Sequence, residues 1–381
     1  MRFFHTADLH LGKKIYEHSM LEEQRHILGQ ILALAEEYRP DALLIAGDIY
    51  DKPSPPAEAV SLLDDFLTAC CEAELPVLLI AGNHDSPERL SFGGRIMAQR
   101  QVIPVGIFSG EPGCWQFRDD FGPVEFLLLP FIKPALARPF FPDRPIEDYT
   151  QAMAAALGPP PENDGCRRVL LAHQFITGGG CVPQRSDSET VNVGGLDEVD
   201  AGVLSAFDYV ALGHLHRPQS VAAPHIRYAG SPLKYSFSEI DHAKSLTMVD
   251  LAAKGNMEIQ PLPLTPCRDL RQLKGPLPVL LQAPLSEKER QDYIRVILTE
   301  RPEEGDPLAL LRSRYPNLLR LDYPMPGEST DVLPEEDLAE ELRDPVSLFK
   351  NFYFLQHGET LSQEQENLFR KILQQAEERD L

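Results

Sequence analysis

Side chains able to bind metal follow five apolar runs of this 381-residue sequence, each where the run ends. In chain order they are Asp8 and His10, Asp48, Asn83 and His84, His173, and His214 and His216. Ligands of an open α/β sheet bind outside the carboxyl ends of its strands. We therefore expect all five groups to face one crevice.

The donor set indicates which metals and which chemistry such a crevice would support. Carboxylate, amide and imidazole groups without a thiolate suit Mn, Fe or Zn. Three or four donors would complete one metal, so seven donors with a shared carboxylate fit two. Two metals about 3.5–4 Å apart hold phosphate oxygens and activate water, which is a device for phosphoryl transfer. His173 alone could be a core histidine and Asn83 alone a turn residue, but together the five strand ends predict a two-metal site.

The spacing within these groups carries further expectations. In extended backbone, residues i and i+2 face the same side, so Asp8 and His10 are expected to point the same way, as are His214 and His216. The glycines that precede Asp48, Asn83 and His214 allow tight turns and close packing.

The first 135 or so residues contain the elements that would position these groups. Apolar runs alternate with two stretches whose apolar residues recur at the period of a helix. Pro55 and Pro56 stand just before the second of these stretches, where a helix can begin. This β-α-β-α-β order predicts a right-handed, doubly wound sheet with helices on both faces. The expected strands are 2–8, 42–48 and 76–85, and the expected helices are 20–38 and 57–73.

Five more strands are expected before a change of composition near Pro261. They are 124–130, 168–173, 208–214, 226–230 and 245–251. The stretch 261–267 is expected to be a linker, and a small α/β unit follows it, with Ser286 as a helix N-cap. In that unit we expect a strand at 278–283, helices at 286–299 and 307–314, and a strand at 317–324. A last helix is expected at 362–380.

Bulk properties bound the class of protein. The length exceeds the roughly 250–300 residues at which single cores split, so a large domain with smaller additions is expected. No apolar run reaches the ~20 residues of a membrane span, and no secretion signal is expected at the start. The six cysteines are expected to be buried, reduced thiols of a cytoplasmic protein. The net charge of −22 argues against a stand-alone nucleic-acid binder, because phosphate affinity comes largely from Lys and Arg.

Five short motifs together resemble those of the calcineurin-like metallophosphoesterases. They read ADLH, GDIYD, GNHD, AHQF and GHLH, in this order along the chain. Longer segments, among them IAGNHDSPERL and YAGSPLKYSFSE, resemble the SbcD family of nuclease subunits. The resemblance implies an α/β sandwich of two mixed sheets flanked by helices, with a small α/β capping domain and a C-terminal helical extension. The implied domains are a nuclease domain at 1–262, a DNA-binding capping domain at 263–326, and a linker with partner-binding helices at 327–381.

The resemblance also implies roles for the strand-end residues. Two Mn²⁺ ions are expected, with Mg²⁺ as the alternative ion. The first would be held by Asp8, His10, Asp48 and His216, and the second by Asp48, Asn83, His173 and His214. His84 would contact the scissile phosphate and assist the leaving 3′-oxygen, and Asp51 would orient His84 by a hydrogen bond.

The function implied is that of a Mn-dependent DNA nuclease in DNA end processing, repair and recombination. It would act as a 3′–5′ double-strand exonuclease and as a single-strand and hairpin endonuclease, in the cytoplasm at the nucleoid. The implied partner is SbcC, an SMC-like ATPase, in a heterotetramer with two copies of each subunit. The aromatic-rich segment 348–354 is a candidate anchor for SbcC, and the alternative is internal packing. The segment 91–100 is a candidate homodimer surface.

Three cations close in sequence to the strand-end residues, Lys13, Lys14 and Arg217, are candidates for DNA phosphate contact or simply solvated. An acidic chain can be a nuclease if bound metals supply local positive charge and a partner protein supplies DNA binding.

Two alternatives to the nuclease remain at this stage. One is a metallophosphoesterase of other specificity, such as a phosphatase or a small phosphodiesterase, which the motifs alone do not exclude. The other is a non-catalytic scaffold, against which the complete set of ligands argues.

Overall fold

The computed structural model describes residues 1–159, 165–180, 183–189, 197–300, 305–323, 346, 349–350, 352–354 and 360–377. The predicted linker that begins at residue 327 lies largely outside these residues. The chain divides into two compact units, Met1–Gln272 with Leu285–Ile294, and Leu273–Pro284 with Arg295–Leu381. The domain boundaries expected from the sequence stay a prediction.

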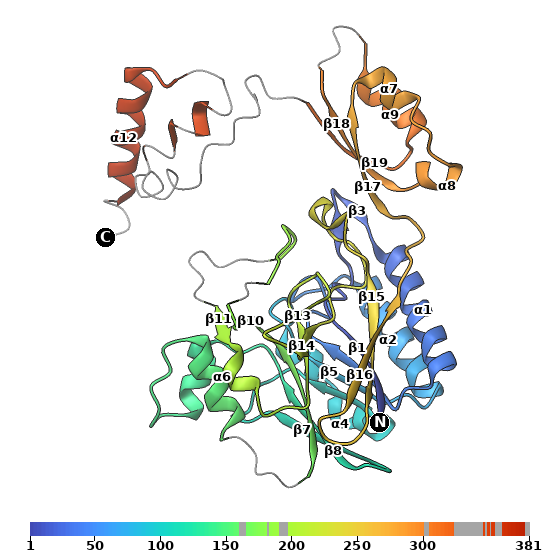
Figure 1. The fold of residues 1–381 in the computed structure, drawn as a ribbon. Coiled ribbons are helices and arrows are strands. Elements are labelled where there is room, and N and C mark those ends of the chain that lie inside the picture. The colour runs from blue at the N-terminus through green and yellow to red at the C-terminus, as the bar shows by residue number, and fades with distance from the viewer. Residues whose placement is uncertain are drawn as a thin grey trace. The chain divides into compact units, whose positions relative to one another are not determined.

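The first unit contains two six-stranded mixed sheets (Figure 1). The first sheet has the order β16-β15-β1-β4-β5-β6, in which β1, β4, β5 and β6 are parallel, β15 pairs antiparallel with β1, and β16 pairs antiparallel with β15. Its strands are β1 (Arg2–Thr6), β4 (Ala42–Ala46), β5 (Val77–Ile80), β6 (Val102–Val105), β15 (Ser245–Leu251) and β16 (Met257–Pro263).

The second sheet has the order β13-β14-β12-β9-β8-β7. Strands β8, β9, β12 and β14 run parallel, and β7 and β13 are antiparallel edges. The strands are β7 (Gly113–Asp119), β8 (Gly122–Leu129), β9 (Arg167–His173), β12 (Tyr209–Gly213), β13 (Gln219–Val221) and β14 (Ala223–Tyr228). The expected pair of mixed sheets is therefore confirmed.

The two sheets face each other across a shared apolar core. Phe3 and Leu44 of the first sheet belong to the same buried cluster as Phe126, Leu171 and Tyr209 of the second. The expectation that helices cover both faces of the first sheet is wrong, because one face is buried by the second sheet. Strands β4 and β5 are apolar on both faces, and that pattern does not distinguish a covering helix from a covering sheet.

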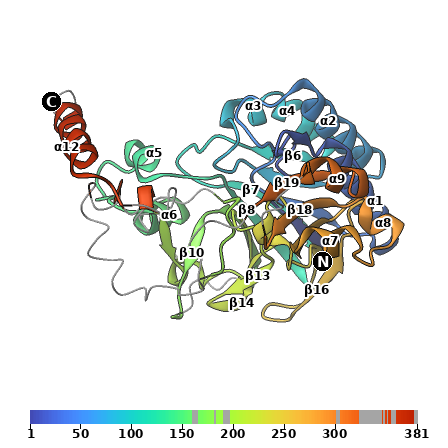
Figure 2. The ribbon, with the colours of Figure 1, turned by 90° about the horizontal axis from the view of Figure 1, so that it is seen from above.

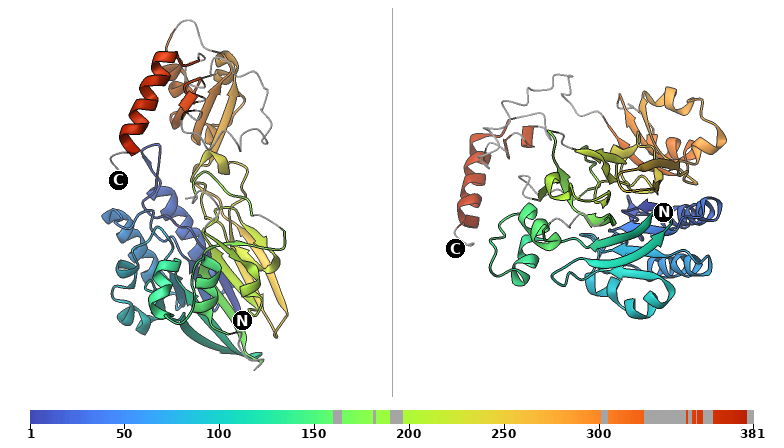
Figure 3. Two further views of the ribbon diagram at one scale, coloured as in Figure 1. Left: turned by 90° about the vertical axis from the view of Figure 1, so that its left-hand side faces the viewer. Right: turned by 60° about the horizontal axis from the view of Figure 1, so that its bottom comes forward.

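Helices cover the outer faces of this sandwich. Helices α1 (Leu21–Tyr38) and α2 (Ala57–Glu72) pack together on the first sheet's side, and α6 (Tyr149–Leu157) packs on the second sheet's side (Figures 2 and 3). Further short elements are β2 (Lys14–Ile15), β3 (His18–Ser19), α3 (Pro87–Ser91), α4 (Gly94–Met97), η1 (Ala98–Arg100), α5 (Pro134–Ala137), η2 (Arg138–Phe140), β10 (Phe175–Thr177), β11 (Glu198–Asp200), η3 (Ala201–Leu204) and η4 (Phe237–Glu239).

A three-stranded sheet follows, with the order β17-β18-β19, and the division between the two units passes through it. Its strands are β17 (Leu270–Gly275), β18 (Tyr293–Leu298) and β19 (Leu318–Asp322), and its helices are α7 (Leu277–Leu281), α8 (Glu287–Arg290) and α9 (Pro307–Arg314). The helix at 307–314 and the strand near 317–324 are confirmed. Strand β17 was not expected from the sequence.

Two expectations in this region are wrong. The residues expected as a strand at 278–283 largely form helix α7, because Pro276 and Pro278 occupy the helix start, where proline is favoured. The helix expected at 286–299 stops after α8, although Ser286 does make the capping box with Glu289. The β-branched and aromatic run that follows enters the sheet as β18.

The expected linker at 261–267 is partly wrong as well, since β16 continues to Pro263. Proline is tolerated there because β16 is an edge strand. The last expected helix is present as α12 (Gln363–Glu377). The five cysteines among the described residues are free thiols, as expected, but the expectation that they are buried is wrong for all of these except Cys70. No helix in the described ranges has the length and apolar character needed to cross a membrane.

Candidate metal centre

Four of the strand-end residues have a left-handed backbone conformation. Strand β1 stops at Thr6, and φ is +54° at Asp8, +44° at His10, +49° at Asp48 and +100° at His214. Non-glycine residues rarely adopt such values, and they cluster at functional sites. Asp8 and His10 do face the same group of ligand atoms, as expected, but curled loops and not an extended backbone present these side chains.

Hydrogen bonds between the loops hold this strained backbone. The N–H of Asp8 donates to the Gly47 carbonyl at 3.0 Å, and the N–H of His10 donates to the Asp48 carbonyl at 2.9 Å. The N–H of His214 donates to the Asp8 carboxylate at 2.9 Å. The loops after β1, β4 and β12 thus fix one another.

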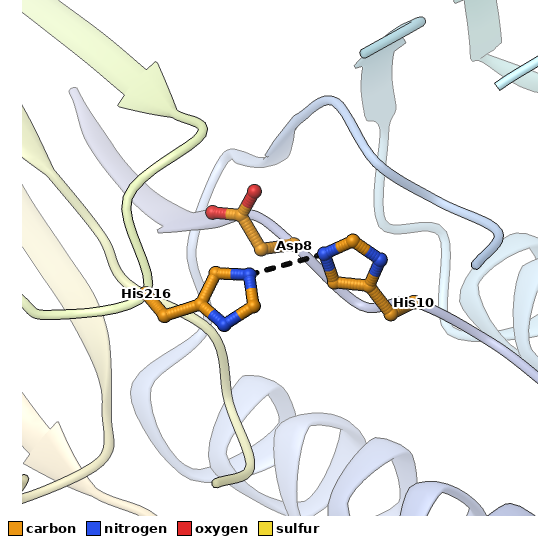
Figure 4. Close-up of side chains that lie close together, drawn as sticks. All are labelled: Asp8, His10 and His216. Atoms are coloured by element: carbon orange, nitrogen blue, oxygen red, sulfur yellow. Dashed lines mark hydrogen bonds between the residues drawn. The ribbon is translucent and has the colours of Figure 1, made fainter. Parts of the chain in front are cut away.

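A first group of donors consists of Asp8, His10 and His216 (Figure 4). Their ligand atoms all lie within 4.8 Å of one another, and all three residues are buried. The Nε2 atoms of His10 and His216 face each other at 3.1 Å. Imidazole nitrogens gathered beside a buried carboxylate are ligands that suit a divalent cation.

A second group surrounds Asp48 and His173, with Asp8 again within reach. The Asp48 Oδ2 atom is 3.4 Å from His173 Nε2 and 3.6 Å from His10 Nε2, so it lies between the two groups. The Asn83 Oδ1 atom is 3.1 Å from both His173 Nε2 and His214 Nδ1. The structure therefore brings all seven candidate ligands together.

Outer contacts fix which nitrogen of a histidine faces the centre. His173 Nδ1 lies 2.8 Å from the Ala46 carbonyl oxygen, which can only accept, so Nδ1 carries the proton. His216 Nδ1 likewise lies 3.1 Å from Glu239 Oε1. In both residues Nε2 is then left to bind a metal, which is the arrangement usual for metal-binding histidines. The residues present thus fit two divalent cations.

Burial and neighbouring charges set the ionisation of the centre. Burial raises the pKa of Asp8 to about 7, and the nearby Asp48 carboxylate adds to this against the opposing effect of His173 and His216. Burial would raise the pKa of Asp48, but the neighbouring histidines His173, His10 and His84 outweigh burial and hold that pKa below its ordinary value. Burial lowers the pKa of His214 to about 3, so that imidazole is neutral.

Three glycines leave the space that the centre needs. A Cβ atom on Gly47, where φ is +88°, would lie 2.3 Å from His173 Nδ1. A Cβ on Gly82 would lie 2.1 Å from Asp48 Oδ1, and one on Gly213 would lie 1.9 Å from the Ala46 carbonyl oxygen. The expected close packing at these glycines is confirmed, and it explains why no larger residue fits.

His84 lies beside the centre, at the edge between the two donor groups. Its N–H donates to Asp48 Oδ1 at 2.9 Å, and its ring is 5.0 Å from that of His10, between centroids. Its Nδ1 atom lies 3.0 Å from the backbone carbonyl oxygen of Asp51. The Asp51 carboxylate is instead 2.7 Å from Lys13 Nζ. The hydrogen bond expected from Asp51 to His84 therefore comes from the backbone.

The neighbouring Asp85 and the two other candidate cations, Lys14 and Arg217, have structural partners. The Asp85 carboxylate accepts the N–H groups of Ile49, Tyr50 and Gly82 at 2.8–3.1 Å, so it ties two strand-end loops together. Lys14 lies 3.8 Å from Glu17, and Arg217 donates to Gln184.

A buried network behind His216 was not identified from the sequence. Glu239 accepts from Lys244 Nζ at 2.6 Å as well as from His216. Lys244 also donates to the His216 carbonyl at 2.8 Å, and Glu189 accepts the His216 N–H at 2.7 Å. Glu239 lies in the YAGSPLKYSFSE segment, which was the one signal that could have identified it.

Comparison with family models and with known proteins identifies chains that are similar to this one. A family model for the calcineurin-like phosphoesterases matches residues 1–218, and a model described as the Type 5 capsule protein repressor C-terminal domain matches residues 266–357. The chain is 32% identical to the D subunit of the SbcCD nuclease from Staphylococcus epidermidis and 31% identical to that from Staphylococcus saprophyticus. Each alignment covers 98% of this chain and 98% of the relative.

Two solved structures also share similarity with the chain. The protein TT1561 of Thermus thermophilus aligns with a TM-score of 0.41 at 14% identity, covering 68% of this chain and 98% of its own. A dimetal phosphatase from Danio rerio aligns with a TM-score of 0.39 at 12% identity, covering 70% of this chain and 99% of its own.

Proposed function

This chain belongs to the calcineurin-like phosphoesterases and, within them, to the SbcD nuclease subunits, and from that premise we propose that it cleaves DNA with two Mn²⁺ ions. The proposed activities are 3′–5′ exonuclease on double strands and endonuclease on single strands and hairpins, with Mg²⁺ as the alternative ion. The observation that carries the proposal is Asp48 Oδ2, which lies 3.4 Å from one histidine and 3.6 Å from another, between two donor groups.

We assign ligands from these positions. Asp8, His10 and His216 would hold one ion, Asn83, His173 and His214 would hold the other, and Asp48 would contact both. When bound, the two ions supply positive charge to the phosphate oxygens and lower the pKa of a water molecule. The protein holds the donors in place through the outer contacts described above, so little reorganisation is needed on binding.

His84 is the proposed acid–base residue. It lies beside the donor groups without belonging to either proposed ligand set, and the Asp51 carbonyl fixes Nδ1 as the protonated nitrogen. The Nε2 side of the ring would then contact the scissile phosphate and assist the leaving 3′-oxygen. Asp51 acts as a positioning residue through its backbone.

The test compares three variants for Mn²⁺ binding and for cleavage of plasmid DNA. Asp48→Asn is expected to lose both metal and cleavage. His84→Ala is expected to keep metal and lose cleavage by about 10²–10⁴-fold, the usual contribution of general acid–base catalysis. Asp51→Ala keeps the carbonyl and should retain far more activity than His84→Ala. Full cleavage by His84→Ala would remove that residue from the mechanism.

A parallel assay identifies the substrate class. Hydrolysis of small phosphodiesters or phosphomonoesters at rates well above DNA cleavage would indicate a phosphoesterase of other specificity. We expect DNA cleavage to dominate with Mn²⁺ present.

The C-terminal region is the proposed contact for SbcC. In that region Phe349 stacks on Phe369 at 3.9 Å between centroids, which fixes a small helical pair. Phe352 is 57% exposed, Phe354 52% and Leu368 60%. Exposed aromatic side chains beside a small core are typical of an anchor for a partner.

Because the chain carries a net charge of −22, we propose that SbcC supplies much of the DNA binding. The two proteins would form a heterotetramer, which would act in the cytoplasm at the nucleoid. Residues 263–326 would add DNA contacts as a capping domain. Deleting residues 345–381 should abolish co-purification with SbcC and leave basal phosphodiesterase activity. Undiminished co-purification of the truncated chain would contradict the assignment.

Residues 91–100 are the proposed homodimer surface. Phe92, directly after helix α3, is 86% exposed, and Ile96, within helix α4, is 73% exposed. Two large apolar side chains so close together favour association with a second copy. Phe92→Glu should reduce the mass measured by light scattering to that of a monomer. Phe121→Glu, which changes a 56% exposed phenylalanine elsewhere, serves as the matched control and should not.

A further inference from the structure

The loop that carries Asp8 and His10 is held by two buried side chains, Gln24 and Tyr235. Gln24 lies in the first turn of helix α1 and is 2% exposed, and Tyr235 lies between β14 and η4 and is 4% exposed. Neither residue belongs to a proposed ligand set. Buried polar groups are normally hydrogen-bonded, so the partners of these two side chains indicate their role.

The Gln24 amide bonds three backbone groups of this loop. Its Nε2 atom donates to the His10 carbonyl at 2.7 Å and to the Leu9 carbonyl at 3.3 Å. Its Oε1 atom accepts the N–H of Gly12 at 3.0 Å. The amide orientation is therefore fixed, because only the NH₂ group can donate to carbonyls. One side chain of helix α1 thus holds the backbone on both sides of the turn.

Tyr235 contacts the same loop and both histidines of the first donor group. Its hydroxyl donates to the Leu9 carbonyl and accepts from Gln24 Nε2, the second contact at 3.1 Å. Its ring lies edge to face with the imidazoles of His10 and His216, at 5.6 and 6.0 Å between centroids. The hydroxyl therefore fixes the loop backbone, while the ring packs against two candidate ligands.

These contacts matter because the backbone of the loop is strained. The φ angle is +54° at Asp8 and +44° at His10. Residues other than glycine keep such angles only where the surrounding structure holds them. Among the described residues, the Leu9 carbonyl accepts only from Gln24 and Tyr235. Without these two side chains, the backbone between the two ligands would lose the contacts that tie its carbonyls to the rest of the protein.

We propose that Gln24 and Tyr235 are positioning residues that hold the loop in the conformation needed by the ion assigned to Asp8, His10 and His216. The inference rests on the proposed function, because that function supplies the assignment of two ions. In the described part of the chain, neither side chain makes a hydrogen bond or ring contact with the three donors assigned to the other ion alone. Loss of either side chain should therefore weaken one ion selectively.

The test is calorimetric titration of the full chain with Mn²⁺. Tyr235→Phe removes the hydroxyl and keeps the ring, and Gln24→Glu keeps an acceptor oxygen but offers the carbonyls no N–H donor. In each variant one of the two Mn²⁺ affinities should fall by about 10–100-fold, the range for loss of an outer contact of a metal ligand. The other affinity should stay close to that of the wild type. The weakened step should be the one lost in His216→Ala, not the one lost in His173→Ala.

Two matched controls make the same kinds of contact elsewhere. The buried Tyr315 hydroxyl also donates to a backbone carbonyl, that of Leu280. The Gln30 amide, on the same helix as Gln24, bonds the N–H and the carbonyl of Thr265. Tyr315→Phe and Gln30→Met should therefore keep both Mn²⁺ affinities.

Wild-type affinity for both ions in Tyr235→Phe would overturn the inference, as would an equal loss of both affinities or the same loss in the controls. Thermal unfolding of the metal-free chains shows whether Gln24→Glu folds poorly, in which case Tyr235→Phe decides the test.

DNA cleavage by the wild type, measured with the same Mn²⁺, tests the proposed function separately. If the wild type cleaves DNA and the variants bind both ions normally, only the positioning assignment fails. If the variants lose one ion selectively but the wild type does not cleave DNA, only the proposed function fails. A wild type that binds fewer than two Mn²⁺ ions would overturn both.

Discussion

Glu239→Gln tests whether the network behind His216 prepares that residue for metal. The Glu239 side chain is buried and lies between His216 Nδ1 at 3.1 Å and Lys244 Nζ at 2.6 Å. Both neighbours are donors, and a carboxylate accepts from both. A glutamine has one oxygen and one NH₂ group, so whichever way the amide is turned, a donor faces a donor.

The size of the effect follows from this geometry. Removing one partner of a buried ion pair costs about 3–5 kcal/mol, because the other charge is left uncompensated. In Glu239→Gln the uncompensated charge would be that of Lys244, which is buried at 6% exposure. Loss of an outer partner of a metal-binding histidine lowers metal affinity by 10–100-fold, or about 1.4–2.7 kcal/mol. We therefore expect Mn²⁺ binding at least tenfold weaker and a lower thermal midpoint.

The assay is calorimetric titration of Mn²⁺ into the variant and the wild type, with thermal unfolding of the metal-free chains. Glu125→Gln is the matched control, because Glu125 pairs with Arg168 at 3.0 Å in the second sheet and contacts no candidate ligand. Its metal affinity should equal that of the wild type. The double variant Glu239→Gln with Lys244→Met removes the uncompensated charge and should recover much of the thermal midpoint.

Wild-type Mn²⁺ affinity in Glu239→Gln would refute this reasoning. It would mean that His216 finds its orientation without Glu239, or does not bind metal. An equal loss in Glu125→Gln would also contradict it, because the effect would then reflect general destabilisation.

Two further predictions concern close packing and pH. Gly82→Ala should abolish Mn²⁺ binding in a calorimetric titration, because the new Cβ would lie 2.1 Å from Asp48 Oδ1, whereas Gly29→Ala, with nothing within 4 Å, should leave binding unchanged. Burial raises the pKa of Asp119, but the ion pair with Arg167 outweighs it and holds that pKa below its ordinary 3.8. This stabilisation is complete above pH 3.8 and is lost as the pH falls through the lower folded value, so the difference in thermal midpoint between the wild type and Asp119→Asn should shrink below that pH. A difference that does not change with pH would contradict the ion-pair explanation.

Local pattern was sufficient for much of the fold. Helices α1 and α2 follow the apolar period, and the Pro307–Arg314 helix was predicted at its observed bounds. The small sheet was harder to predict, because Ser286 signals a helix start while the next residues favour a strand. Strand β18 forms because neighbouring strands pair with it, and that pairing overrides the local cap signal.

The sequence by itself determined which side chains end the buried strands, because residue type and apolar runs are local properties. Only the tertiary structure decided how these side chains meet. It placed Asp48 between two donor groups, curled the backbone at Asp8 and His10, and brought Glu239 behind His216. It also showed that the partner of His84 Nδ1 is the backbone carbonyl of residue 51 and not the Asp51 carboxylate. Any residue type at position 51 would offer that carbonyl, so the residue type could not predict this contact. Distances between loops and the direction of backbone groups depend on packing, which residue spacing does not specify.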